Sequence, residues 1–111
     1  IRLYWITASD WIRFQMYDGS DYAIRTAVLL HQTEYRVMAT YDGVGGMALY
    51  LDGEEVGQQT YAATDFDCVN GTVGGDGATR DFLGALDDVT VFLRELSPAD
   101  AKLWTRGGEV A

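Results

Sequence analysis

The chain has 111 residues, a length that fits one domain and leaves little room for a second. Hydrophobic residues make up 48% of it, which excludes an intrinsically disordered segment. Seventeen acidic residues against eight basic ones give a formal net charge of −9, which repels phosphate backbones and anionic lipid surfaces. Because of this charge we expect no nucleic-acid partner. No stretch is long and apolar enough to span a bilayer, so we expect no membrane insertion.

The first 17 residues are predicted to form a β-hairpin that turns at Ser9-Asp10 and places Trp5 opposite Phe14. Side chains alternate along a strand, so one face of this hairpin is apolar and the other is mixed. The polar and aromatic residues that share the mixed face are Tyr4, Trp11, Arg13, Gln15 and Tyr17.

Further strands are predicted at 22–30, 35–41, 47–51, around Val56 and at 86–93, divided by glycine-rich turns. Asp52-Gly53 predicts a type I′ hairpin turn, because both central residues of that turn need a positive φ. Ser97 is a good N-cap for one short C-terminal helix that starts at Pro98, and Asp100 completes the capping arrangement. Gly107-Gly108 is expected to end this helix.

Three ordered sequence blocks and the helix resemble a known family. The central hairpin of laminin-G-like jelly rolls is similar to YDG at 41–43 together with LYLDG at 49–53. The strand that follows in that family is similar to VGG at 73–75. GALDDVTVF at 84–92 and LSPAD at 96–100 resemble their closing strand and helix. The resemblance runs from residue 34 to residue 104 and implies an all-β, antiparallel, concanavalin A-like sandwich.

The chain departs from the family pattern at its N-terminal side. Family members carry additional N-terminal strands that this chain lacks, and Glu34 stands where a tryptophan is common. We therefore interpret residues 1–111 as the C-terminal portion of one such domain. Either the chain is a fragment of a longer one, or the fold is trimmed, or an oligomer partner supplies the missing strands.

Asp87 is the candidate metal ligand. In many concanavalin A-like sandwiches the aspartate of the closing strand helps to bind a structural calcium ion, so the resemblance implies one calcium at Asp87. Calcium needs six to eight oxygen ligands, and the partners of Asp87 would lie in the missing N-terminal portion. The alternative interpretation is a polar residue that caps the start of a strand.

The mixed face of the first hairpin is the candidate ligand surface. Flat aromatic rings beside planar hydrogen-bonding groups suit a carbohydrate, but exposed aromatic residues equally mark a protein interface or a surface that further strands cover. Two functions follow. The first is a non-catalytic, carbohydrate-binding module of an extracellular or cell-surface protein. The second is a structural, assembly or decoration domain of a filament, coat or virion that makes protein–protein contacts.

Enzymatic activity is not expected. His31 is the one histidine and Cys68 the one cysteine, so the chain offers neither a zinc site nor a catalytic triad. The related glycosidases place acidic residues at alternate positions of one strand. Here Glu54 and Glu55 are adjacent, as are Asp87 and Asp88, so in a strand the two carboxylates of each pair point to opposite faces.

Overall fold

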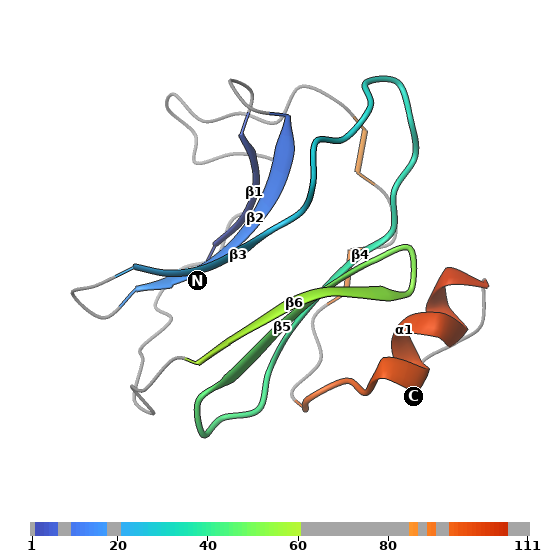
Figure 1. The fold of residues 1–111 in the computed structure, drawn as a ribbon. Helices are drawn as coiled ribbons and strands as arrows, with labels where there is room; N and C mark the ends of the chain where they lie inside the picture. Colours follow the sequence, from blue (N-terminus) through green and yellow to red (C-terminus); the bar gives the residue numbers. More distant parts are fainter. Residues whose placement is uncertain are drawn as a thin grey trace.

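The computed structural model of the chain describes residues 2–6, 10–17, 21–60, 85–86, 89–90 and 94–106. Within these ranges the chain forms two three-stranded antiparallel sheets and one helix (Figure 1). The first sheet contains, in spatial order, β1 (Arg2–Ile6), β2 (Trp11–Tyr17) and β3 (Asp21–Arg25). The second contains β4 (Val37–Tyr41), β5 (Gly46–Leu51) and β6 (Glu54–Thr60), and the helix is α1 (Pro98–Thr105). The predicted all-β sandwich with a short C-terminal helix is confirmed.

The main core lies between the two sheets. Because side chains alternate along a strand, each sheet turns one row of apolar side chains toward the other sheet. The buried residues of these two rows are Phe14, Met16, Ile24, Met47 and Leu49. The layers approach most closely where β3 passes β6. A Cβ added to Gly57 there would lie 3.1 Å from Cγ2 of Ile24, so glycine permits this contact.

A smaller cluster holds α1 on the outer face of the second sheet. Met38 and Tyr50 on the strands pack against Leu96 and Ala101. The helix begins as predicted: Ser97 Oγ accepts the N–H of Asp100 at 3.1 Å, and Asp100 Oδ2 accepts the N–H of Ser97 at 2.8 Å. It ends at Thr105, and the glycines predicted to end it lie outside the described residues.

The first hairpin differs from the prediction in its register. Trp5 lies opposite Ile12 and Leu3 opposite Phe14, so residues 7–10 connect the strands instead of a two-residue turn. Asp10 has a φ of 53°, the left-handed conformation that a turn residue of this kind tolerates. Because the correction is a shift of two residues, each side chain keeps its predicted face.

The third strand is shorter than predicted and ends at Arg25 instead of Leu30. Thr26 ends it, because its side-chain oxygen accepts the N–H of Ile12 at 3.1 Å and donates to the carbonyl of Ala27 at 2.8 Å. Beyond Thr26 the chain departs from the regular ladder, although the N–H of Leu29 still donates to the carbonyl of Asp10 at 2.7 Å. In the predicted strand 86–93, the described residues 85–86 and 89–90 have no regular secondary structure, and the remainder lies outside the described ranges.

Candidate functional site

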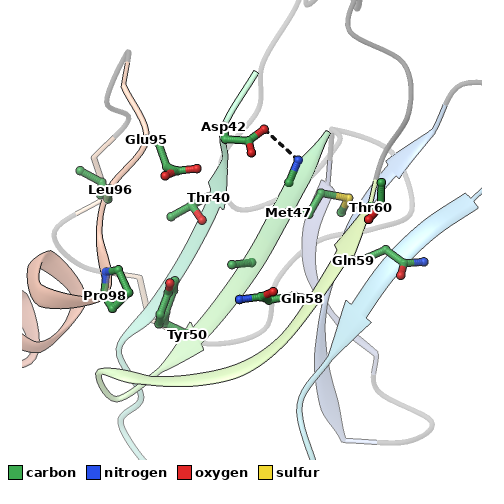
Figure 2. Close-up of a pocket in the computed structure, with 12 residues that line it drawn as sticks. Thr40, Asp42, Met47, Tyr50, Gln58, Gln59, Thr60, Glu95, Leu96 and Pro98 are labelled. Atoms are coloured by element: carbon green, nitrogen blue, oxygen red, sulfur yellow. Dashed lines mark hydrogen bonds between the residues drawn. The ribbon is translucent and has the colours of Figure 1, made fainter. Parts of the chain in front are cut away.

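A groove of about 440 Å³ lies on the outer face of the second sheet, beside the segment that leads into α1 (Figure 2). We call it the polar groove. Its lining residues are Thr40, Asp42, Gly46, Met47, Ala48, Tyr50, Gln58, Gln59, Thr60, Glu95, Leu96 and Pro98.

The strand register explains why this surface is hollow. Thr40 pairs with Ala48, and Ala48 pairs with Gln58, so the three residues form one row across the outer face. Gly46 and Thr60 form the next pair on the same face. The central strand therefore contributes only a hydrogen atom and a methyl group at positions 46 and 48. Longer side chains on both flanking strands and residues 95–98 form the walls.

Several polar side chains of the groove are not engaged by any residue that the structure describes. The Thr40 and Thr60 hydroxyls, the Gln58 amide and the Glu95 carboxylate make no side-chain hydrogen bond to any described residue. Figure 2 shows Thr40, Tyr50 and Gln58 on the side of the sheet that faces Leu96 and Pro98. The groove thus offers hydroxyl, amide and carboxylate groups to a ligand in one concave surface.

Asp42 forms a fixed corner of the groove. Its Oδ1 accepts the N–H groups of Val44 and Gly46, each at 2.8 Å. These hydrogen bonds, from Gly46 first and Val44 second, lower the pKa of the Asp42 carboxyl below its ordinary value of 3.8. A side chain at position 46 would overlap the Asp42 carboxylate, so glycine is needed here for the turn as well as for the hollow.

Tyr50 closes the inner end of the groove. The residue is buried, and burial raises the pKa of its hydroxyl, with smaller contributions from the carboxylates of Glu55 and Glu95. The phenol therefore keeps its proton at neutral pH and can act as a hydrogen-bond donor. The whole residue is 5% exposed, which leaves little of its ring for a ligand to stack on.

The residues predicted for the ligand surface lie on the outer face of the first sheet. The register places Tyr4 opposite Arg13, and Gln15 beyond them on the same face. Trp11 shares this face, whereas the Tyr17 side chain lies outside the described residues. The Tyr4 hydroxyl donates to Gln15 Oε1 at 3.0 Å, so the sheet brings these four predicted residues together. Their role in ligand binding remains a prediction.

Arg25 and Ala23 join this surface, and the sequence analysis missed both. The guanidinium carbon of Arg25 lies 4.1 Å from the centre of the Trp11 ring and covers one face of it. Trp11, Arg13, Ala23 and Arg25 line a shallow groove of about 360 Å³, which we call the arginine groove. Ala23 and Arg25 are two residues apart, so alternation places both on one face of the predicted strand. The sequence did not show that this strand pairs with the first hairpin, so the shared surface was not predicted.

The comparison with known families assigns the chain. A family model described as "Concanavalin A-like lectin/glucanases superfamily" matches residues 1–102. The chain belongs to this family. The resemblance seen from residue 34 onward is therefore confirmed, and the match also includes the first hairpin.

A solved structure has a similar fold. It is that of an S-layer domain-containing protein from Clostridium thermocellum, with a TM-score of 0.60 and 22% sequence identity to this concanavalin A-like domain. The match covers 95% of the chain described here and 61% of the other chain, so this domain corresponds to only part of that protein. At this identity the similarity concerns the fold alone. No curated protein sequence matches the chain.

The predicted calcium site falls outside the described residues, because Asp87 does. Among the residues that are described, no three His, Cys, Asp or Glu side chains gather in a way that could hold a metal ion. His31 Nε2 lies 2.9 Å from Asp10 Oδ1, and the His31 ring centre is 6.0 Å from that of Trp5. Calcium binding by Asp87 stays a prediction.

The helix found in the described ranges, α1, is too short and too polar to cross a membrane.

The lowered pKa of Asp42 predicts an acid-sensitive contribution to stability. A folded-state pKa below the unfolded value means that the contribution is present above about pH 3.8 and is lost as the pH falls toward the folded pKa. Asparagine at position 42 can still accept both N–H groups but carries no charge. Asp42→Asn is therefore expected to melt below the wild type at pH 6, with a difference that shrinks on acidification to pH 3.

Thermal unfolding of both proteins, followed by circular dichroism at several pH values, measures this difference. Asp100, whose pKa is also lowered, is present in both proteins, so its contribution cancels in the comparison. A difference in Tm that stays constant between pH 6 and pH 3 would show that the charge of Asp42 does not stabilise the turn.

Proposed function

We propose that this concanavalin A-like domain is a non-catalytic binding module of an extracellular or cell-surface protein, and that its polar groove binds a glycan. The observation that carries the proposal is a set of hydroxyl, amide and carboxylate groups in one concave surface, none of which bonds through its side chain to a described residue. A sugar ring presents several hydroxyl groups, each of which both donates and accepts hydrogen bonds, so it needs such a set.

The chemistry of the groove favours an uncharged sugar. The Gln58 amide can donate and accept, the Thr40 and Thr60 hydroxyls can do both, and the Glu95 carboxylate accepts. Asp42 and Glu95 are both acidic, and the described lining of the groove contains no basic side chain, so its charge disfavours an anionic sugar. A volume of about 440 Å³ falls within the ordinary range for small-molecule sites. With the Tyr50 ring buried, binding rests on hydrogen bonds rather than on aromatic stacking.

The same groove gives no support for glycoside hydrolysis. A general acid needs a raised pKa to hold its proton at neutral pH, whereas the turn lowers the pKa of Asp42. Glu54 and Glu55 stand on adjacent positions of β6, and the register pairs Glu55 with Tyr50 and Glu54 with Leu51. Their side chains therefore start on opposite faces of the sheet and do not flank one bond.

Gln58 and Glu54 provide a paired test of the polar groove. Gln58 lies in the outer row with Ala48, whereas Glu54 pairs with Leu51 on the opposite face of β6 and is not one of the residues that line the groove. We expect Gln58→Ala to raise the Kd for a neutral oligosaccharide at least tenfold and Glu54→Ala to change it by less than threefold. Both residues are exposed, so neither change should affect folding.

The measurement is a titration of the ¹⁵N-labelled chain with neutral gluco-, manno-, xylo- and chito-hexasaccharides, followed by amide chemical shifts. Shifts confined to β4, β5, β6 and residues 94–98 support the groove. If none of the four sugars shifts these amides, or if Glu54→Ala weakens binding as much as Gln58→Ala, the polar groove is not the glycan site.

An assembly domain is the second candidate function. Val28 and Leu30, in the connection between β3 and β4, are each 69% exposed, and exposed aliphatic side chains are suited to protein contacts. The fold similarity to an S-layer domain-containing protein is compatible with a place in a surface layer. Sedimentation velocity separates the two functions. Self-association that Val28→Ser and Leu30→Ser abolish, without any glycan binding, would favour assembly.

A further inference from the structure

The arginine groove carries two like charges in direct opposition. Arg13 on β2 is the cross-strand partner of Arg25 on β3, so both side chains leave the same outer face from neighbouring positions. Like charges placed opposite each other destabilise an antiparallel sheet. A chain with a net charge of −9 has many acidic residues with which to neutralise this pair.

No carboxylate of a described residue neutralises this pair. In the part of the chain that the structure describes, neither arginine forms an ion pair or a hydrogen bond through its side chain. Asp10, the neighbour of Trp11 in sequence, has its carboxylate beside His31 instead. The acidic position on the same face of β3 is Asp21, four residues from Arg25 and therefore ~13 Å away along the strand.

The groove orients one guanidinium group for a ligand. The guanidinium carbon of Arg25 lies 4.1 Å from the centre of the Trp11 ring, a cation–π contact that restrains the group. Trp11 Nε1 is buried and has no hydrogen-bond partner among the described residues. The groove therefore combines two guanidinium groups that no described residue pairs, and its described lining contains no acceptor side chain.

We propose that the arginine groove binds the carboxylate of an acidic saccharide, such as a uronic acid unit. A guanidinium group binds a carboxylate through two parallel N–H···O hydrogen bonds, and the second arginine supplies further charge. The volume of about 360 Å³ and the lining of only four residues suit one or two sugar rings better than a protein surface, because a stable protein interface buries about 800 Å² on each partner. The Tyr4–Gln15 pair on the same face offers neutral hydrogen-bonding groups beside the charge.

This site is separate from the polar groove. Phe14 and Ile24 point into the core between the sheets, so the alternate residues Arg13 and Arg25 lie on the opposite, outer face of the first sheet. The polar groove lies on the outer face of the second sheet, on the other side of the sandwich. One sugar unit cannot occupy both grooves, and the two differ in preference, the polar groove for neutral units and the arginine groove for acidic ones.

The test compares tetragalacturonate with its fully methyl-esterified form, two sugars of the same backbone that differ in charge. We expect tetragalacturonate to shift the Trp11 indole N–H resonance and the amides of β2 and β3, and its ester to bind at least tenfold more weakly. Arg13→Gln should weaken tetragalacturonate binding at least tenfold. Arg106→Gln, at the C-cap of α1, makes the same change in net charge and should leave binding unchanged.

Two further comparisons keep the result interpretable. Arg25→Lys retains the charge and loses the planar fork, so it should weaken binding even if Arg13→Gln fails to fold. Gln58→Ala should not affect tetragalacturonate, which separates this site from the polar groove. Equal binding of acid and ester, equal loss in Arg106→Gln and Arg13→Gln, or no binding would overturn the proposal. So would tighter binding of a hexaglutamate peptide, which would assign the groove to an acidic protein partner.

Discussion

Leu49→Ala is expected to lower the free energy of unfolding by about 2–5 kcal/mol, as large-to-small changes at buried positions do. Leu49 lies on the central strand of the second sheet, is 0% exposed and packs in the cluster that joins the two sheets. Its cross-strand neighbours are Ala39 and Gly57, which are too small to fill the space that a lost isobutyl group leaves.

Leu30→Ala is the control, because Leu30 is 69% exposed and the same change there should stay within about 0.5 kcal/mol. Chemical denaturation of both variants, with the slope m compared between them, measures the two effects. If Leu49→Ala were as mild as Leu30→Ala, the two sheets would not share a packed core, and the sandwich arrangement itself would be wrong.

Gly53→Ala is expected to have the second large effect, because two penalties add at this position. Gly53 has a φ of 84°, and a Cβ there would lie 3.0 Å from Thr105 Oγ1 and 3.3 Å from the Cα of Lys102. The left-handed backbone alone costs about 1–2 kcal/mol for a residue with a Cβ. The close approach to the backbone of α1 adds to this cost, because that backbone would have to move by a few tenths of an ångström and is less able to do so than a flexible side chain.

Gly43→Ala is the control, because it carries the backbone penalty alone. Gly43 has nearly the same φ, 83°, but a Cβ there meets nothing within 4 Å. The difference in unfolding free energy between the two variants therefore reports how closely α1 packs on the β5–β6 turn. Equal losses in the two variants would mean that the helix does not press on Gly53.

The sequence predicted most of the second sheet and the helix, because local rules decide them. Asp52 and Gly53 both have the positive φ that a type I′ turn requires, and Ser97 and Asp100 form the predicted reciprocal cap. The third strand was predicted too long because Val28 and Leu30 favour a strand by composition. Thr26 ends the strand through a hydrogen bond to Ile12, a residue 14 positions earlier, and a local pattern contains no such information.

The candidate sites show the same limit. The shared face of Tyr4, Trp11, Arg13 and Gln15 followed from alternation and survived a register error of two residues. The polar groove was not predicted, because it depends on the pairing of Ala48 with Thr40 and Gln58 from two other strands. A small residue in a strand predicts a hollow only when its cross-strand neighbours are known.

A glycan array probed with the purified, fluorescently labelled chain at low and physiological salt distinguishes glycan binding from assembly. We expect retention on a restricted set of glycans, with neutral structures lost in Gln58→Ala and acidic structures lost in Arg13→Gln. A folded chain that retains no glycan at either salt concentration would contradict a glycan-binding function and leave the assembly function as the better explanation.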